Sequence, residues 1–148
     1  MNTTEITKKY RANWTMPSPE TMRADFDEYK KKELSKWEGR AKSIGARFPI
    51  FNSFEDFVNT IKSGQIINAP LSSFTHCSSI EEIESMVSAY IYPRDVQRIV
   101  DGFETGAAMP YPIILQGKIG QFRLSGNTRS NVAWLLKLPV KALLVNVK

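Results

Sequence analysis

The order of apolar patterns in the C-terminal quarter of the chain is the feature that most constrains its fold. An apolar run at residues 112–115 is followed by a turn with two glycines and then by residues 121–125, in which polar and apolar residues alternate. Such alternation is typical of a half-buried strand, whereas the apolar residues from 127 to 138 recur with helical spacing. Pro139 ends that helix, and the apolar segment 140–147 follows it. The expected order of strand, turn, strand, helix and strand predicts an α/β (α+β) fold with a small mixed sheet flanked by helices.

Capping signals predict several helices upstream of this unit. Ser53 with Asp56, and Ser79 with Glu82, resemble capping boxes, in which the serine and the acidic side chain satisfy backbone amides at a helix start. Proline is tolerated at the first helical position, so two prolines mark further starts, and Ser18 can cap the helix that begins at Pro19. We therefore expect helices from Pro19 to about Arg40, from Ser53 to just before Gly64, from Ser79 through Ile91 and from Pro93 to just before Gly106, with a short strand at Gln65–Ile67.

The N-terminal third differs in character from the rest of the chain. Residues 1–17 are polar with scattered aromatic residues and end in Pro-Ser-Pro, which is typical of an irregular arm. The helix that follows is charged, with Lys30–Lys32 in its middle. At 148 residues the chain has room for one domain of ordinary size. We expect an N-terminal extension over residues 1–50, made of the arm and the charged helix, and a core over residues 51–148.

Composition excludes several classes of protein. The apolar runs are far shorter than the roughly 18 residues that a membrane span needs, and the N-terminus lacks the charged-then-apolar pattern of a signal peptide. Cys77 and His76 are the single residues of their kinds, which excludes an internal disulfide and a Cys/His metal centre. We expect an inert thiol at Cys77 and a surface role for His76. The protein is expected to be cytoplasmic, with no membrane partner.

Positive charge without acidic residues distinguishes the C-terminal quarter. The net charge of the chain is +5, and residues 111–148 contain six Lys or Arg residues but no Asp or Glu. This balance favours an anionic partner such as a phosphate, a nucleotide or a nucleic acid. An ordinary basic surface would have the same composition, so composition alone does not separate the two interpretations.

The segment Leu124–Arg129 is the best candidate for binding an anion, because a strand passes there directly into a helix. The first amide groups of a helix have no partners within it and bear a partial positive charge. Gly126 permits close approach of a ligand and unusual dihedral angles, and Asn127 or Thr128 can cap the helix or contact the same anion. Arg129 lies in the first turn, where a cation is unfavourable unless an anion is bound nearby. The alternative is that Arg129 pairs with a neighbouring carboxylate.

The stretch from Pro110 to Val147 resembles the C-terminal half of the ParB/sulfiredoxin-like domain. The resemblance rests on Pro112–Leu115, on the Gly-x-x-Arg box within Phe122–Arg129, and on Lys137–Val145. Members of this family bind a nucleoside triphosphate at the helix start, so the resemblance implies ATP or CTP with Mg²⁺ as the ligand. The resemblance implies phosphate contacts from Gly126, Asn127, Thr128 and Arg129. We expect Ser125 and the basic residues Arg123 and Lys118 to line the same pocket.

The chain departs from the catalytic members of that family. A sulfiredoxin has a cysteine and a histidine between the glycine and the arginine of the box, and this chain has Asn127 and Thr128 there, which excludes the reductase chemistry. The serine kinases have an acidic residue where this chain has Ser125, and the ParB clamps have a second arginine in the box. Residues 1–50 do not match the family at all.

Two functions from different classes follow. The first is a phosphotransferase, which would act on a nucleic-acid component or on a small hydroxyl acceptor. The second is a catalytically inert module that retains the scaffold and binds DNA or a protein. Phosphoryl transfer usually needs a carboxylate. The candidate catalytic residue is Asp95, which lies between Arg94 and Arg98 in the sequence. The alternative is that Asp95 is simply an acidic residue at a helix start, where a negative charge is favourable. A small basic protein with an accessory arm is typical of phages and mobile elements.

Aromatic residues and lysines in the N-terminal region favour a nucleic-acid partner. The residues concerned are Tyr10, Trp14, Tyr29, Trp37 and Lys30–Lys32. Stacking on aromatic rings and neutralisation of phosphates use these residue types. Most of the aromatics recur with helical spacing, however, which is more typical of packing. The oligomeric state is left open by the sequence.

Overall fold

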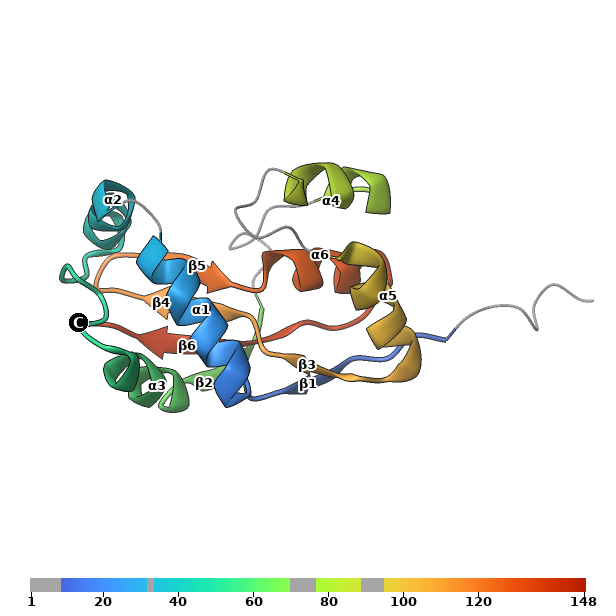
Figure 1. Ribbon diagram of the computed structural model, residues 1–148, viewed down its shortest axis with the longest axis horizontal. Helices are drawn as coiled ribbons and strands as arrows, with labels where there is room; N and C mark the ends of the chain where they lie inside the picture. Colours follow the sequence, from blue (N-terminus) through green and yellow to red (C-terminus); the bar gives the residue numbers. More distant parts are fainter. Residues whose placement is uncertain (1–8, 32–33, 70–76, 89–94) are drawn as a thin grey trace, which may run out of the picture.

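The computed structural model describes residues 9–31, 34–69, 77–88 and 95–148, and these form helices on both sides of small sheets (Figure 1). The predicted α+β class is confirmed. The elements are β1 (Asn13–Thr15), α1 (Pro19–Lys31), α2 (Leu34–Ile44), α3 (Phe54–Lys62), β2 (Gln65–Asn68), α4 (Ile80–Val87), α5 (Val96–Thr105), β3 (Ala108–Pro110), β4 (Ile113–Gln116), β5 (Gln121–Ser125), α6 (Asn127–Leu135) and β6 (Lys141–Asn146). Among these residues, no helix is both long enough and apolar enough to span a membrane.

The main sheet has four strands in the order β2-β6-β4-β5. Strand β6 is parallel to β4, whereas β2 pairs with β6 and β5 pairs with β4 in antiparallel fashion. The predicted order of strand, turn, strand, helix and strand corresponds to β4, β5, α6 and β6. Strand β4 is central and buried on both faces, which accounts for its uninterrupted apolar run.

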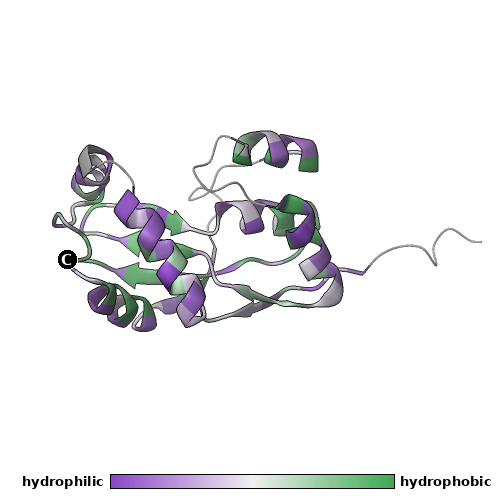
Figure 2. Cartoon of the chain, in the orientation of Figure 1, coloured by the Kyte–Doolittle hydropathy of each residue, from purple (hydrophilic) through white to green (hydrophobic). Residues whose placement is uncertain are grey.

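Helices α1, α2 and α3 cover one face of the main sheet (Figure 1), and the first hydrophobic core lies between them. Ile113 and Leu115 of β4 face this core, whereas Ile114 faces the other side and packs with Ala142 and the partly buried Trp134. The strands of this sheet are largely hydrophobic in Figure 2, whereas helix α1 is largely hydrophilic. A second core joins α4, α5 and α6 to the smaller sheet, which is formed by β1 and β3.

Residues 1–17 are not a wholly irregular arm, because Asn13–Thr15 form β1 and pair in parallel with β3, residue Asn13 lying opposite Ala108. Trp14 packs edge-on against Phe103 at a ring-centroid distance of 5.7 Å, and its indole N–H donates to the carbonyl of Pro139 at 2.9 Å. Residues 1–8 lie outside the described residues. The N-terminal segment is thus part of the second core.

The charged helix expected over residues 19–40 consists of two helices, α1 and α2, on either side of residues 32–33, which lie outside the described residues. Their apolar side chains Met22, Phe26 and Trp37 belong to the same core as the main sheet. The expected division at residue 50 therefore does not separate two hydrophobic cores.

Most of the predicted helix starts are confirmed. The hydroxyls of Ser18, Ser53 and Ser79 each accept a hydrogen bond from the backbone amide three residues later, at 3.0–3.1 Å. The last predicted helix before the C-terminal unit begins at Val96 rather than at Pro93, because Asp95 has extended backbone angles and caps α5. Residues 89–94, including Ile91 and Pro93, lie outside the described residues.

Candidate functional site

The candidate site lies where β5 passes into α6. Gly126 joins them with φ 96° and ψ 11°, a left-handed conformation that favours glycine. A Cβ at this position would lie 2.5 Å from Cβ and 2.6 Å from Cα of Pro112. The unusual dihedral angles are therefore confirmed, and the group that approaches Gly126 most closely is a neighbouring part of the protein itself.

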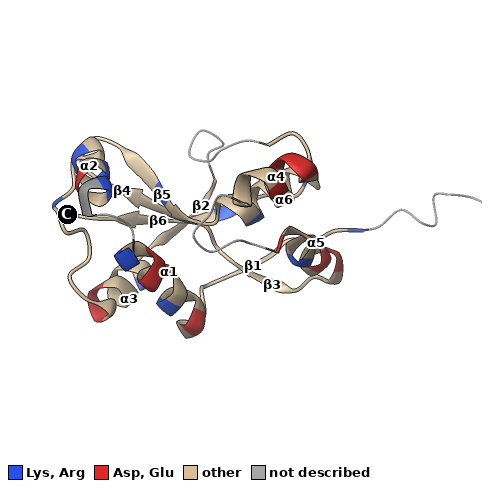
Figure 3. Cartoon of the chain, turned by 45° about the horizontal axis from the view of Figure 1, so that its top comes forward, with Lys and Arg blue, Asp and Glu red and all other residues tan. Residues whose placement is uncertain are grey.

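Helix α6 begins without a capping side chain. Gly126 is its N-cap and makes no side-chain hydrogen bond, and the first turn contains no acidic residue. A helix start of this kind attracts anions, because its first amides and the helix dipole present positive partial charge. The strands around it, β4 to β6, also lack acidic residues, which Figure 3 shows on helices such as α1, α4 and α5 instead.

Polar side chains are buried at this helix start. Among the described residues, every buried polar residue falls in α6, and these are Asn127 (7% exposed), Thr128 (5%), Ser130 (0%) and Asn131 (2%). Asn131 links the helix to the segment before α4, since its Oδ1 accepts the amide of Cys77 at 2.9 Å. Its Nδ2 donates to the carbonyl of Asn127 at 2.9 Å, and Nδ2 of Asn127 lies 3.4 Å from the Met86 sulfur.

Two buried hydroxyls flank the start of α6. The Oγ atoms of Ser125 and Ser130 are inaccessible to solvent and have no hydrogen-bond partner in the part of the chain that the structure describes. A buried polar atom without a partner is unfavourable and uncommon, and it is often explained by an unseen ligand or water.

Arg129 donates hydrogen bonds to two backbone carbonyls. Its Nε donates to the carbonyl of Pro110 at 2.7 Å and its Nη2 to that of Tyr111 at 3.2 Å. Pro110 is the last residue of β3 and Tyr111 follows it, so the guanidinium ties α6 to the junction of the two sheets. These two bonds join the guanidinium to neither an anion nor a carboxylate, the two partners expected from the sequence, so a phosphate-binding role for Arg129 stays a prediction.

The two other basic residues predicted for the pocket lie elsewhere on β5 and its turn. Lys118 is in the β4–β5 turn, where its amide donates to the carbonyl of Gly45 at 3.4 Å. That turn is at the opposite end of β5 from Gly126. Arg123 pairs with Ile114 in mid-strand and is close to Arg40, whose pKa is lowered by burial and by the charge of Arg123. The predicted residues that lie together at the helix start are therefore Ser125 to Arg129, and Lys118 is not among them.

Asp95, the candidate catalytic residue, caps helix α5. Its Oδ1 accepts a hydrogen bond from the amide of Arg98 at 3.0 Å, and the residue is exposed. This is the helix-start role that the sequence offered as the alternative. A catalytic role for Asp95 remains a prediction.

The thiol of Cys77 is close to the site. Burial, and to a lesser extent the charge of Glu82, raise its pKa, and its sulfur lies 3.9 Å from that of Met86. A raised pKa keeps the thiol protonated, which fits the expected inert cysteine. His76 lies outside the described residues. The structure as described contains no group of three or more His, Cys, Asp or Glu side chains suited to a metal ion.

Sequence reasoning missed the contributions of Ser130, Asn131 and Met86. Asn131 follows Asn127 by four residues and so shares its helix face, which is the one local signal that could have indicated a polar patch there. The contact with Cys77 brings together residues 54 positions apart and has no local signature.

No family model matches the chain, and no curated protein or solved structure is significantly similar to it. The resemblance to the ParB/sulfiredoxin-like domain therefore stays a prediction, which rests on the residues quoted for it.

Proposed function

We infer that the start of helix α6 binds the phosphate groups of a nucleotide. The observation that carries this proposal is the concentration of buried polar residues at one uncapped helix start, from Asn127 to Asn131. Polar groups are costly to bury without partners, and apolar packing alone would not place four of them together. The hydroxyls of Ser125 and Ser130, which lack partners among the described residues, would gain one from a bound phosphate.

The absence of acidic residues from β4, β5, α6 and β6 supports an anionic ligand. The resemblance to the ParB/sulfiredoxin-like domain narrows this ligand to ATP or CTP with Mg²⁺. Magnesium is commonly held by phosphate oxygens and water with few protein ligands, so a nucleotide site of this kind does not need an acidic cluster.

The proposal is one of binding, and phosphoryl transfer would extend it. Transfer usually requires a carboxylate that orients the acceptor or holds the metal. Asp95 is the candidate, but its carboxylate is engaged by the amide of Arg98. Release of phosphate from ATP by the wild-type protein would support the enzyme interpretation.

The second candidate is an inert binding module for DNA or a protein. The bonds from Arg129 to the carbonyls of Pro110 and Tyr111 favour it, because they give the arginine a structural role that needs no ligand.

Thermal unfolding with ATP, CTP, GTP or dTTP, with and without Mg²⁺, tests the proposal. A nucleotide at about 100 times its dissociation constant adds roughly 2.7 kcal/mol to the stability of the folded state. We expect a Mg²⁺-dependent rise in melting temperature with one nucleotide. No rise with any nucleotide, together with a rise on adding a DNA duplex, would favour the second candidate.

The variant Arg129→Ala sharpens this test. We expect it to weaken nucleotide binding by about 1.5–3 kcal/mol, the size of a hydrogen bond to a charged group, and also to lower stability because two carbonyls lose their donor. Binding is therefore measured by calorimetry at a temperature where both proteins are folded. Lys62→Ala, which removes an exposed cation from α3, is the control and should leave the affinity unchanged. Wild-type affinity in folded Arg129→Ala would remove this arginine from the site.

A further inference from the structure

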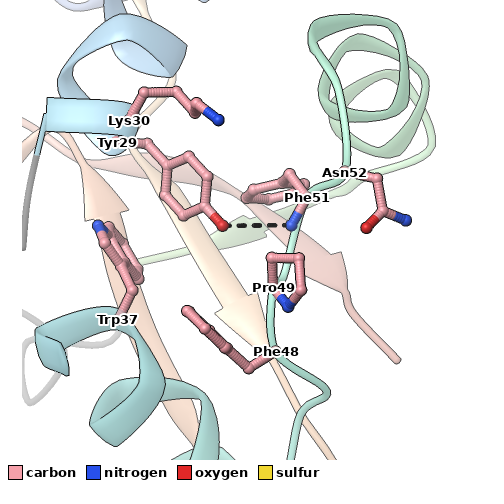
Figure 4. Close-up of a pocket in the computed structure, with 7 residues that line it drawn as sticks. All are labelled: Tyr29, Lys30, Trp37, Phe48, Pro49, Phe51 and Asn52. Atoms are coloured by element: carbon pink, nitrogen blue, oxygen red, sulfur yellow. Dashed lines mark hydrogen bonds between the residues drawn. The ribbon is translucent and has the colours of Figure 1, made fainter. Parts of the chain in front are cut away.

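A pocket lies between α1, α2 and the segment that precedes α3 (Figure 4). It has a volume of about 250 Å³, and we call it the aromatic pocket. The side chains that matter for its chemistry are those of Tyr29, Lys30, Trp37, Phe48, Phe51 and Asn52.

The walls of the aromatic pocket are rings held in place by other rings. Tyr29 packs edge-on against Trp37 at a centroid distance of 4.7 Å and against Phe51 at 5.3 Å. These three residues are at least 94% buried, whereas Phe48 at the mouth is 39% exposed. The indole N–H of Trp37 is buried and has no acceptor among residues that the structure describes. The packing of these rings on one another means that the pocket is preformed.

Positive charge lies beside this pocket. Lys30 lines it, and none of the lining residues that the structure describes is an Asp or a Glu. The guanidinium of Arg40 lies over the ring of Trp37 at 4.9 Å and over that of Phe122 at 4.6 Å. Arg123 is near enough to contribute, with burial, to lowering the pKa of Arg40. An anion beside the pocket would be attracted by the charges of Lys30 and Arg40.

We propose that the aromatic pocket receives an unstacked base of a single-stranded nucleic acid whose phosphates lie against Lys30 and Arg40. Aromatic side chains that stack with bases, next to cations that follow the backbone, are the general means of binding single strands. An apolar peptide side chain would also fit between rings, but it would gain nothing from the cations. A duplex keeps its bases stacked and so cannot insert one without unpairing it.

This proposal does not depend on the nucleotide site at α6. Trp37 contacts the ring of Phe122, near the beginning of β5, at 5.9 Å, whereas Gly126 follows the last residue of that strand. At about 3.3 Å per residue, the two places are on the order of 13 Å apart along β5. Either site could be disproved while the other stands.

Fluorescence anisotropy with a labelled twelve-residue oligothymidylate and its ribonucleotide counterpart tests the proposal on the full-length chain. We expect Phe48→Ala to weaken binding about 5- to 150-fold, the range found when a stacking ring is removed. Phe48 is partly exposed, so this variant should keep its fold, which circular dichroism and urea unfolding will verify. Ile66→Ala is the matched control, because Ile66 is 52% exposed on β2 at the other edge of the sheet.

The salt dependence of binding tests the cations. Each phosphate contact on a single strand contributes about 0.7 to the slope of log affinity against log salt concentration. Lys30→Ala and Arg40→Ala should each reduce the slope by about this amount, and Arg98→Ala on α5 should not. The proposal is overturned if the wild-type chain does not bind the oligonucleotides. It is also overturned if Phe48→Ala binds as well as wild type, or if an unlabelled duplex competes as well as a single strand.

Discussion

At the scale of single residues, Gly126 is needed for reasons internal to the protein. Its φ of 96° lies in the region that residues with a side chain avoid, and the direction of a Cβ is occupied by Pro112. Close approach to a ligand is therefore not required to explain the glycine. The same contact fixes where α6 starts relative to β4, and so fixes the position of the candidate site.

Gly126→Ala should lower the free energy of unfolding by about 2–5 kcal/mol. Left-handed backbone costs about 1–2 kcal/mol for a residue with a Cβ, and the overlap with Pro112 adds about 1–3 kcal/mol. Urea unfolding measures the change. Gly39→Ala is the control, because the new methyl group in α2 would meet no atom within 4 Å apart from its chain neighbours and its own helix backbone, and it should raise stability by up to about 1 kcal/mol. Equal stability of Gly126→Ala and wild type would show that the turn tolerates a side chain.

Ser130 is a second residue whose substitution is informative. Its hydroxyl is fully buried and lacks a partner among the described residues, so Ser130→Ala should leave stability unchanged or raise it by up to about 1 kcal/mol. Nucleotide affinity should fall if this hydroxyl contacts the phosphate. Ser53→Ala, which removes the cap of α3, should instead cost about 1 kcal/mol. A similar loss of stability in Ser130→Ala would mean that this hydroxyl already makes a stabilising hydrogen bond within the protein.

At the scale of elements, the sequence predicts what depends on short-range contacts. The caps at Ser18, Ser53 and Ser79 join residues three positions apart, and β5 follows from a strict alternation, so all of these are confirmed. Strand β1 was missed because its partner β3 lies about 95 residues later, and three residues carry no pattern of their own. Proline is typical of a first helical position, so the sequence predicts that α5 starts at Pro93, whereas the helix begins at Val96 and is capped by the Asp95 carboxylate.

The candidate site was predictable to a similar extent. The passage from strand through Gly126 into α6 follows from the sequence, because an alternating run, a glycine and a helical run occur in succession. The partners of Arg129 did not follow, since they are carbonyls of residues 18 and 19 positions away. Backbone carbonyls have no sequence signature, so only the tertiary structure could identify them.

Two substitutions at Asp95 distinguish a role as the cap of α5 from a catalytic role. Asparagine is as good an N-cap as aspartate, whereas alanine is not. Asp95→Asn should therefore keep the stability of wild type, and Asp95→Ala should lose about 1 kcal/mol, as judged by urea unfolding. If Asp95 is catalytic, both variants lose the release of phosphate from ATP. Activity retained by Asp95→Asn would restrict this residue to the cap of α5.

At the scale of the whole molecule, the two hydrophobic cores share their connections. The segment from β3 to β4 passes from the second core to the first, and Arg129 binds its carbonyls from α6. The N-terminal segment contributes to both cores, through β1 in one and through α1 and α2 in the other. The described residues before position 51 therefore contribute to both cores, although their sequence is polar and charged enough to suggest an appendage.

A fragment consisting of residues 51–148 should not fold cooperatively. Its loss of residues 1–50 would remove the buried side chains of Met22, Phe26, Tyr29, Trp37, Ile44 and Ile50 from the first core. Burial of each such side chain is worth about 1.5–3 kcal/mol, and six of them together match the 5–15 kcal/mol by which a typical domain is stable. Their removal would also expose Phe57, Ile113 and Leu115 to water. Circular dichroism during urea unfolding should show no sigmoidal transition for the fragment and one for the full chain. A cooperative transition in the fragment would show that residues 1–50 are an extension that the core does not need in order to fold.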